Sequence, residues 1–168
     1  MTEGKLYFAY GSNINLDQMA HRCPAAEVVG PVVLENYRLL FRGNRRGRGV
    51  ATIVPHKGQM VHGLLWKITP ECERSLDAYE GWPSLYEKQS VIVRDRAGQE
   101  STVMVYVMDV FREPAEPSRY YYDGILEGYQ KNGLPVAALE GALEHCLKEV
   151  DRKLEQINLS KRRTGHER

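Results

Sequence analysis

The chain has 168 residues, of which 42% are apolar and 27% are charged, and its formal net charge is +1. This length and composition are typical of one soluble domain, and the near-zero charge favours neither a nucleic-acid nor a membrane partner. The sequence lacks an apolar run of the ~20 residues that a membrane span needs, and its N-terminus lacks a secretory signal. Its three cysteines, Cys23, Cys72 and Cys146, form no CxxC pair, so we expect reduced thiols and a cytoplasmic protein.

The first half of the chain is rich in strand-like segments. Lys5–Tyr10 is a continuous apolar run that is typical of a strand buried on both faces. Asn15 and Gln18 have the spacing of a capping box, which predicts a helix that ends near Cys23, before Pro24. Four further strand-like runs follow, at Val28–Val33, Tyr37–Phe41, Val50–Val54 and Val61–Ile68.

The second half changes from strands to helices. Thr69 and Pro70 begin a predicted helix that ends near Gly81, and two strands are then expected at Ser90–Val93 and Thr102–Met108. Ser118 can cap a helix that Gly133 ends, and Pro135 begins the last helix. The apolar face of that last helix consists of Val136, Leu139, Leu143, Leu147, Val150, Leu154 and Ile157.

The order of these elements predicts the fold class. Strands come mostly first and helices last, which favours an α+β fold with a closed or strongly curved sheet over a doubly wound fold. We therefore predict one domain over residues 1–157. The polar segment 158–168 is predicted to be a disordered tail.

Common catalytic motifs are missing from the sequence. It has no G-x-S-x-G elbow and no P-loop, and the glycines of "GNRRGRG" do not have the dinucleotide-binding order. The five histidines show neither H-x-x-x-H nor Cys–His spacing for a metal. Any catalysis is therefore expected to use no metal, no cofactor and no covalent nucleophile.

Two short stretches carry polar groups that suit catalysis. Gly11-Ser12-Asn13 lies between a predicted strand and a helix start, where free backbone N–H groups can hold a carboxylate, a phosphate or a developing oxyanion. Glu80 is expected at a helix C-terminus beside Tyr79 and Trp82, where the helix dipole and desolvation raise a carboxylate pKa toward that of a general base. A plain structural turn and a solvated glutamate remain the alternatives.

Two other stretches are less specific. Tyr120, Tyr121 and Tyr122 precede a glycine-rich helix, where they line a site or simply pack. The segment 42–48 contains Arg42, Arg45, Arg46 and Arg48, which suit an anion clamp, an RNA-binding loop or a solvated connection.

Taken in order along the chain, several blocks resemble the γ-glutamylcyclotransferase family, including its AIG2-like members. The resemblance covers about Lys5 to Pro135, and no family signature is seen between Phe41 and Gly49. The blocks are "LYFAYGSN", "GVATIVP", "VHGLLWKI", "LDAYEG", "YEKQSVIV" and "PSRYYYDGILEGYQKNGLP".

This resemblance implies a small mixed β-barrel of about five to seven strands, with flanking helices and a long C-terminal helix. It implies cyclisation of a γ-glutamyl amide to 5-oxoproline, with a small-molecule substrate, no cofactor, no metal, and a monomer or homodimer. Glu80 is the implied general acid/base. The implied substrate-binding residues are Tyr7, Phe8, Ala9, Tyr10, Gly11, Ser12 and Tyr121, the last with a register of one residue either way.

The substrate itself stays open at this point. A γ-glutamyl amino acid, a γ-glutamylamine and a biosynthetic γ-glutamyl intermediate all fit, and Arg45, Arg46 and Arg48 hint at an acidic leaving group. Two other classes of function compete: a non-catalytic small-molecule-binding or interaction module on the same fold, and an RNA-binding protein. The low net charge counts against RNA binding.

Overall fold

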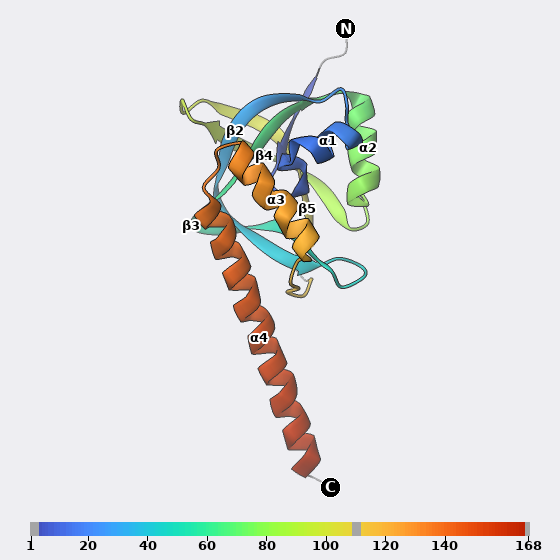
Figure 1. Cartoon of the computed structure of the whole chain (residues 1–168), viewed down its shortest axis with the longest axis vertical. Helices are drawn as coiled ribbons and strands as arrows, with labels where there is room; N and C mark the ends of the chain where they lie inside the picture. Colours follow the sequence, from blue (N-terminus) through green and yellow to red (C-terminus); the bar gives the residue numbers. More distant parts are fainter. Residues whose placement is uncertain (1–3, 109–111, 167–168) are drawn as a thin grey trace.

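The five strands of the described chain close into a barrel, with the strand order β1-β3-β2-β4-β5. The computed structural model describes residues 4–108 and 112–166. The helices lie outside the barrel, and α4 extends away from it (Figure 1). The strands are β1 (Lys5–Ala9), β2 (Glu27–Gly43), β3 (Gly49–Ile68), β4 (Tyr86–Asp95) and β5 (Glu100–Met108). The helices are η1 (Ser12–Ile14, a 3₁₀ turn), α1 (Leu16–Arg22), α2 (Pro70–Glu80), α3 (Arg119–Lys131) and α4 (Val136–His166).

Strands β2 and β3 form one long antiparallel hairpin that supplies most of the barrel wall. The sequence predicts four separate strands here, but each pair of runs merges into a single strand of 17 or 20 residues. Register shifts between Val28 and Gly30 and between Glu35 and Tyr37 interrupt the pairing without ending it. Such bulges bend a strand and increase its twist, which lets a two-stranded ribbon curve around the core.

The barrel closes through β1. This strand pairs antiparallel with β3 and parallel with β5, where Tyr7 lies opposite Met104. The closed sheet surrounds a core that includes Phe8, Ile53 and Val105, all fully buried. Closure holds the C-terminal end of β1, and therefore the turn at Gly11, beside strands that are distant in sequence.

Helix α4 is longer than the sequence predicts. Its N-terminal half packs on the barrel through residues such as Leu139 and Cys146. The helix continues to His166 instead of ending at Ile157, so the predicted disordered tail is corrected to helix over residues 158–166; residues 167–168 lie outside the described part. No proline occurs between Val136 and His166 to stop the helix. None of the described helices, α4 included, is long and apolar enough to cross a membrane.

Gly63 provides a test of the contact between β1 and β3. A methyl group at Gly63 would overlap the carbonyl oxygen of Ala9 and lie 2.5 Å from a ring carbon of Phe8. We expect Gly63→Ala to lower the free energy of unfolding by about 1–3 kcal/mol, the usual cost of overpacking. Gly141→Ala is the matched control, because it adds the same methyl to α4 with no atom within 4 Å.

The control substitution should raise stability by about 0.5–1 kcal/mol, because alanine favours helix over glycine. Equilibrium urea unfolding of both variants measures the two effects. Equal effects of the two substitutions would show that β1 and β3 do not pack as closely as described.

Candidate active site

The chain leaves β1 through a tight turn at Gly11-Ser12-Asn13. The amide of Ile14 donates to the Gly11 carbonyl at 3.2 Å, and this 3₁₀ turn lies between β1 and α1. Asn15 caps α1 by accepting a hydrogen bond from the Gln18 amide at 3.0 Å, as predicted. The turn is therefore a separate element and not the first turn of α1. The first amides of such a turn have no partner within it.

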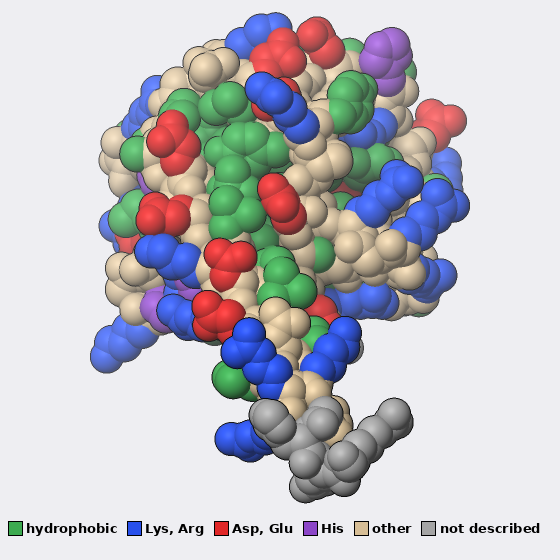
Figure 2. Space-filling view, turned by 60° about the horizontal axis from the view of Figure 1, so that its bottom comes forward, with side chains coloured by type: hydrophobic (Ala, Val, Ile, Leu, Met, Phe, Trp, Pro, Cys, Tyr) green, Lys and Arg blue, Asp and Glu red, His purple; other side chains and the backbone are tan. Residues whose placement is uncertain are grey.

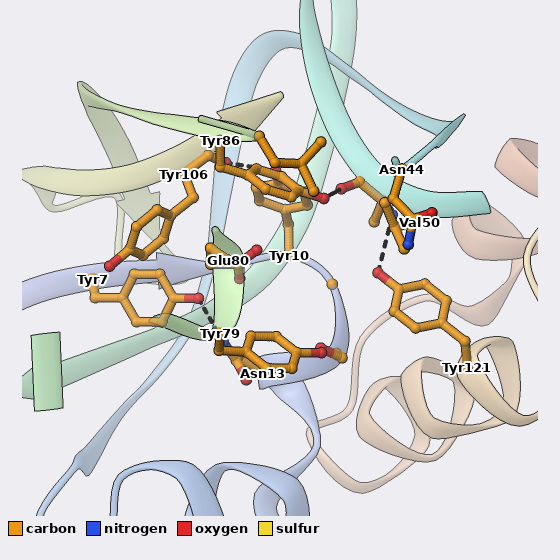
Figure 3. Close-up of a pocket in the computed structure, with 14 residues that line it drawn as sticks. Tyr7, Tyr10, Asn13, Asn44, Val50, Tyr79, Glu80, Tyr86, Tyr106 and Tyr121 are labelled. Atoms are coloured by element: carbon orange, nitrogen blue, oxygen red, sulfur yellow. Dashed lines mark hydrogen bonds between the residues drawn. The ribbon is translucent and has the colours of Figure 1, made fainter. Parts of the chain in front are cut away.

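The turn forms one wall of a cavity of about 110 Å³. This volume is below the roughly 300–1,000 Å³ of a site for drug-sized ligands, so the cavity fits a small group. Figure 3 shows Glu80 near the middle of the lining side chains, with tyrosines around it. The lining residues are Tyr7, Tyr10, Gly11, Ser12, Asn13, Asn44, Val50, Ala51, Tyr79, Glu80, Leu85, Tyr86, Tyr106 and Tyr121.

Glu80 is the last residue of α2, and Gly81 ends the helix in the left-handed conformation with φ of 70°. The residue is partly exposed, and it lines the cavity. Burial of its carboxyl group raises the pKa of Glu80 to about 7, and the nearby positive charge of Arg22 opposes this shift. The Glu80 carboxylate accepts no hydrogen bond from any described residue. It is a desolvated carboxylate that can exchange a proton near neutral pH.

The tyrosine hydroxyls around Glu80 are held in place by bonds to other groups. Tyr10 donates to the Tyr106 carbonyl at 2.6 Å, and Tyr86 donates to the Ala51 carbonyl at 2.7 Å. The Ala51 amide donates to the Tyr121 hydroxyl at 3.0 Å. Burial raises the pKa of Tyr10, Tyr86 and Tyr121 above the usual value, so these hydroxyls stay neutral.

Arg22 connects the turn to α2. Its guanidinium group donates to Asn13 Oδ1 at 2.6 Å and to Ser12 Oγ at 3.3 Å. The same group lies 3.7 Å from the centre of the Tyr79 ring, and the Tyr79 hydroxyl is 2.9 Å from Ser12 Oγ. Cation–π contact and hydrogen bonds together fix the turn relative to the helix that carries Glu80.

Most of the residues that the sequence singles out lie at this cavity. Its lining includes Glu80 and five of the expected substrate-binding residues: Tyr7, Tyr10, Gly11, Ser12 and Tyr121. Phe8 and Ala9 are not among the lining residues, and their part in substrate binding stays a prediction. Both side chains are buried in the core. Phe8 points to the opposite face of β1 from Tyr7, because successive residues of a strand alternate between the two faces.

The tyrosine register is resolved by burial. Tyr120 is 85% exposed, and Tyr122 packs near Phe41 with ring centres 6.4 Å apart. Only Tyr121 of the three lines the cavity. Trp82, expected to desolvate Glu80, is instead 43% exposed and contacts the Lys88 ammonium group.

Several cavity residues were not predicted from the sequence. Tyr86 and Tyr106 come from β4 and β5, where they look like ordinary strand aromatics. Asn13, in contrast, belongs to the predicted Gly11-Ser12-Asn13 turn. Asn44 lies in the arginine-rich loop, where no motif distinguishes it from its neighbours.

The arginine-rich loop joins β2 to β3 beside the cavity. Arg42 is part of β2, and its guanidinium group forms a two-bond ion pair with Glu149 of α4 at 2.9 and 3.1 Å. Asn44 Oδ1 accepts bonds from the Arg46 and Arg48 amides, which shapes the loop. Arg45, Arg46 and Arg48 are exposed, and within the described residues they form no salt bridge.

Comparisons with known proteins agree with this geometry. Residues 7–125 match the family described as "Gamma-glutamyl cyclotransferase, AIG2-like". The chain is 37% identical to human "Gamma-glutamylcyclotransferase" over 142 residues, which is 80% of this chain and 74% of the human protein. The protein of that name from Bos taurus is 36% identical over the same shares. A solved "Gamma-glutamyl cyclotransferase" structure superposes with a TM-score of 0.77 at 33% identity, covering 83% of this chain and 86% of that one. The chain belongs to the gamma-glutamyl cyclotransferase, AIG2-like family.

Proposed function

We propose that this protein cyclises the γ-glutamyl group of a small amide to 5-oxoproline and releases the amine. The observation that carries the proposal is Glu80: a carboxylate with a pKa of about 7, without a hydrogen-bond partner among the described residues, in a small cavity lined by neutral hydroxyls. Membership in the family supports it.

The reaction needs little from the protein besides positioning and proton transfer. The α-amine of the substrate attacks its own γ-carbonyl carbon, so holding the chain folded supplies much of the catalysis. The α-ammonium has a pKa near ~8, close enough to that of Glu80 for proton transfer. Glu80 takes a proton from this ammonium. As the old C–N bond breaks, Glu80 passes this proton to the leaving nitrogen. Glu80, ionised again, then takes the second proton that the ring nitrogen loses once the new C–N bond has formed, which leaves the neutral lactam.

The turn at Gly11-Ser12-Asn13 is proposed to bind the glutamyl group. Its backbone amides and the Ser12 hydroxyl lie at the cavity wall, where N–H donors can hold the substrate carboxylate or the developing oxyanion. An added methyl at Gly11 would lie 3.3 Å from Ala51 Cβ and 3.4 Å from the Tyr121 hydroxyl. A methyl group at residue 11 would therefore crowd the cavity wall beside Ala51 and Tyr121.

We further propose that the leaving group is an amino acid and not a simple amine. The cavity volume fits the glutamyl part, so the leaving group must lie toward its opening. Asn44 lines the cavity and belongs to the same loop as Arg45, Arg46 and Arg48. Their exposed guanidinium groups can attract the α-carboxylate of a leaving amino acid. A γ-glutamylamine lacks this charge when its leaving group is a simple amine.

Glu80→Gln tests the base. It keeps the size of the side chain and removes its ability to take a proton, so we expect turnover to fall ~10²-fold or more with folding retained. The measurement is 5-oxoproline release from a panel of γ-glutamyl amino acids, glutathione and γ-glutamylamines. Glu87→Gln, the same change at an exposed glutamate of β4, is the control and should keep full turnover. Normal turnover in Glu80→Gln would refute the assignment.

The pH dependence gives an independent test of Glu80. Its carboxyl must be ionised to act, so kcat/KM of the wild type should rise with pH through about 7.

Because the folded-state pKa is raised, the folded protein binds this proton more tightly than the unfolded chain does. The ionised Glu80 carboxylate therefore lowers the free energy of unfolding of the wild type, and the Glu80→Gln variant does not have this loss. In urea unfolding, the free energy of unfolding of the variant should rise relative to that of the wild type between about pH 4.5 and pH 7, by up to about 3 kcal/mol. A constant difference across this range would contradict the burial of the carboxyl.

Replacing Arg45, Arg46 and Arg48 together by Gln tests the leaving group. We expect kcat/KM for a γ-glutamyl amino acid to fall about tenfold, which is ~1.4 kcal/mol, and the value for a γ-glutamylamine to stay unchanged. The loss should shrink in high salt, because these groups are exposed. Equal losses of kcat/KM for both substrates would show that the loop does not distinguish the leaving groups. Arg94→Gln serves as the control, because Arg94 lies at the opposite end of β4 from the cavity residue Tyr86.

A further inference from the structure

The hydroxyl protons of the cavity tyrosines are not equally available to a ligand. The Tyr10 hydroxyl donates to the Tyr106 carbonyl at 2.6 Å, and the Tyr86 hydroxyl donates to the Ala51 carbonyl at 2.7 Å. The Tyr106 hydroxyl donates to Asp77 Oδ1 at 2.6 Å. A phenol has one proton to donate, so these three hydroxyls can offer a ligand only their lone pairs.

Tyr7 differs, because its hydroxyl oxygen accepts a hydrogen bond. Asn13 Nδ2 lies 3.0 Å from this oxygen, and Arg22 donates to Asn13 Oδ1 at 2.6 Å. A guanidinium group has no acceptor atom, so the Asn13 amide must turn its oxygen toward Arg22 and its NH2 group toward Tyr7. An NH2 group can only donate, and the Tyr7 proton is therefore not used in this contact.

The Tyr7 proton remains available inside the cavity. Within the described part of the chain, the bond from Asn13 is the one hydrogen bond of the Tyr7 hydroxyl. Figure 3 shows this hydroxyl pointing toward the middle of the cavity, where Glu80 lies. Burial, and after it the charge of Glu80, raises the pKa of Tyr7 above its usual value, so the hydroxyl keeps its proton at neutral pH.

Tyr121 also accepts a main-chain bond, but it lies in another part of the cavity. The Ala51 amide donates to its hydroxyl at 3.0 Å, and a methyl group at Gly11 would lie 3.4 Å from the same oxygen. Figure 3 shows Tyr121 on the other side of Glu80 from Tyr7. Tyr121 is therefore beside the turn that is proposed to hold the glutamyl group, and Tyr7 is not.

The proposed cyclisation places its developing charge near Glu80. Glu80 exchanges protons with the attacking nitrogen and with the leaving nitrogen, and both are bonded to the γ-carbonyl carbon while the ring closes. The oxygen on this carbon gains negative charge as the new C–N bond forms. A neutral donor that is already oriented in a cavity shielded from water stabilises such a charge strongly.

We propose that the Tyr7 hydroxyl donates a hydrogen bond to the γ-carbonyl oxygen in the transition state, and that Asn13 is the positioning residue that keeps the Tyr7 proton free. The proton stays on Tyr7 throughout, so the step adds no proton transfer to those of Glu80. The inference rests on the proposed function and divides the cavity: Tyr7 binds the oxyanion, and the turn with Tyr121 binds the glutamyl carboxylate.

Tyr7→Phe tests the donor. It keeps the ring that packs 5.8 Å from the Tyr106 ring and removes only the hydroxyl. We expect kcat for 5-oxoproline release to fall about 10²-fold with KM changed less than about threefold, because the donor acts on a charge that exists only in the transition state. Tyr122→Phe, the same change on α3 outside the cavity lining, is the control and should keep full kcat. A Tyr7→Phe variant with wild-type kcat, or with a raised KM alone, would overturn the proposal.

Asn13→Asp tests the positioning role. The introduced carboxylate still accepts from Arg22 but accepts the Tyr7 proton as well, so kcat should fall about tenfold or more. In the Tyr7→Phe background there is no proton to capture, and the same substitution should lower kcat less than about threefold. Each kcat is taken at the plateau of the pH profile, because a nearby negative charge raises the pKa of Glu80. Asn158→Asp, which adds the same charge at an exposed position of α4, should leave kcat unchanged.

The wild type separates this inference from the function on which it rests. A wild type that releases no 5-oxoproline from any γ-glutamyl substrate would refute the proposed function and the inference with it. An active wild type, with equal losses from Asn13→Asp in both backgrounds, would overturn only the positioning of Tyr7 by Asn13. Urea unfolding of each variant shows that a loss of kcat does not come from a loss of folding.

Discussion

A carboxylate that is largely shielded from water in a small cavity, and that receives neither a hydrogen bond nor a close ion pair, is costly, and this constraint organises the centre of the molecule. The polar groups near Glu80 form hydrogen bonds with other partners: Tyr10 and Tyr86 donate to main-chain carbonyls, and Arg22 donates to Asn13. Each of them could have neutralised or bonded the carboxylate. Because they do not, Glu80 keeps an affinity for protons that suits proton transfer at neutral pH.

The barrel makes this arrangement possible because it fixes the partners of those hydrogen bonds. The Ala51 carbonyl in β3 accepts from Tyr86 of β4 and the Ala51 amide donates to Tyr121 of α3, so the main chain of one residue connects three elements. Tyr106 of β5 donates to Asp77 of α2 at 2.6 Å and holds the helix that ends in Glu80. Rigid strands and helices, rather than mobile loops, therefore position most of the groups that surround the carboxylate.

The sequence predicted the fold class and the principal positions because these have local signals. The Gly-Ser-Asn turn, the helix caps at Asn15, Thr69 and Ser118, and the glycine after Glu80 depend on neighbours within a few residues. Strand ends inside the hairpin were harder to predict, since Asn36 and Gly58 adopt positive φ within continuous strands and look like turn residues. Tyr86 and Tyr106 were missed because only barrel closure brings them to the cavity. Arg22 was missed because no sequence motif marks the bonds that it makes from the end of α1 back to the turn. The block resemblance also includes Phe8 and Ala9, because it does not distinguish side chains that line the cavity from side chains that pack in the core.

The pairing of β1 with β5 also sets the order in which the protein can form. The β2–β3 hairpin closes over a short loop, whereas Tyr7 and Met104 pair although more than half of the chain separates them in the sequence. Loops of that length lose more entropy on closing, and distant contacts slow folding. Tyr7 and Tyr106, with ring centres 5.8 Å apart across this seam, both line the cavity. The complete cavity lining therefore requires the pairing of β1 with β5, a contact between segments far apart in the sequence.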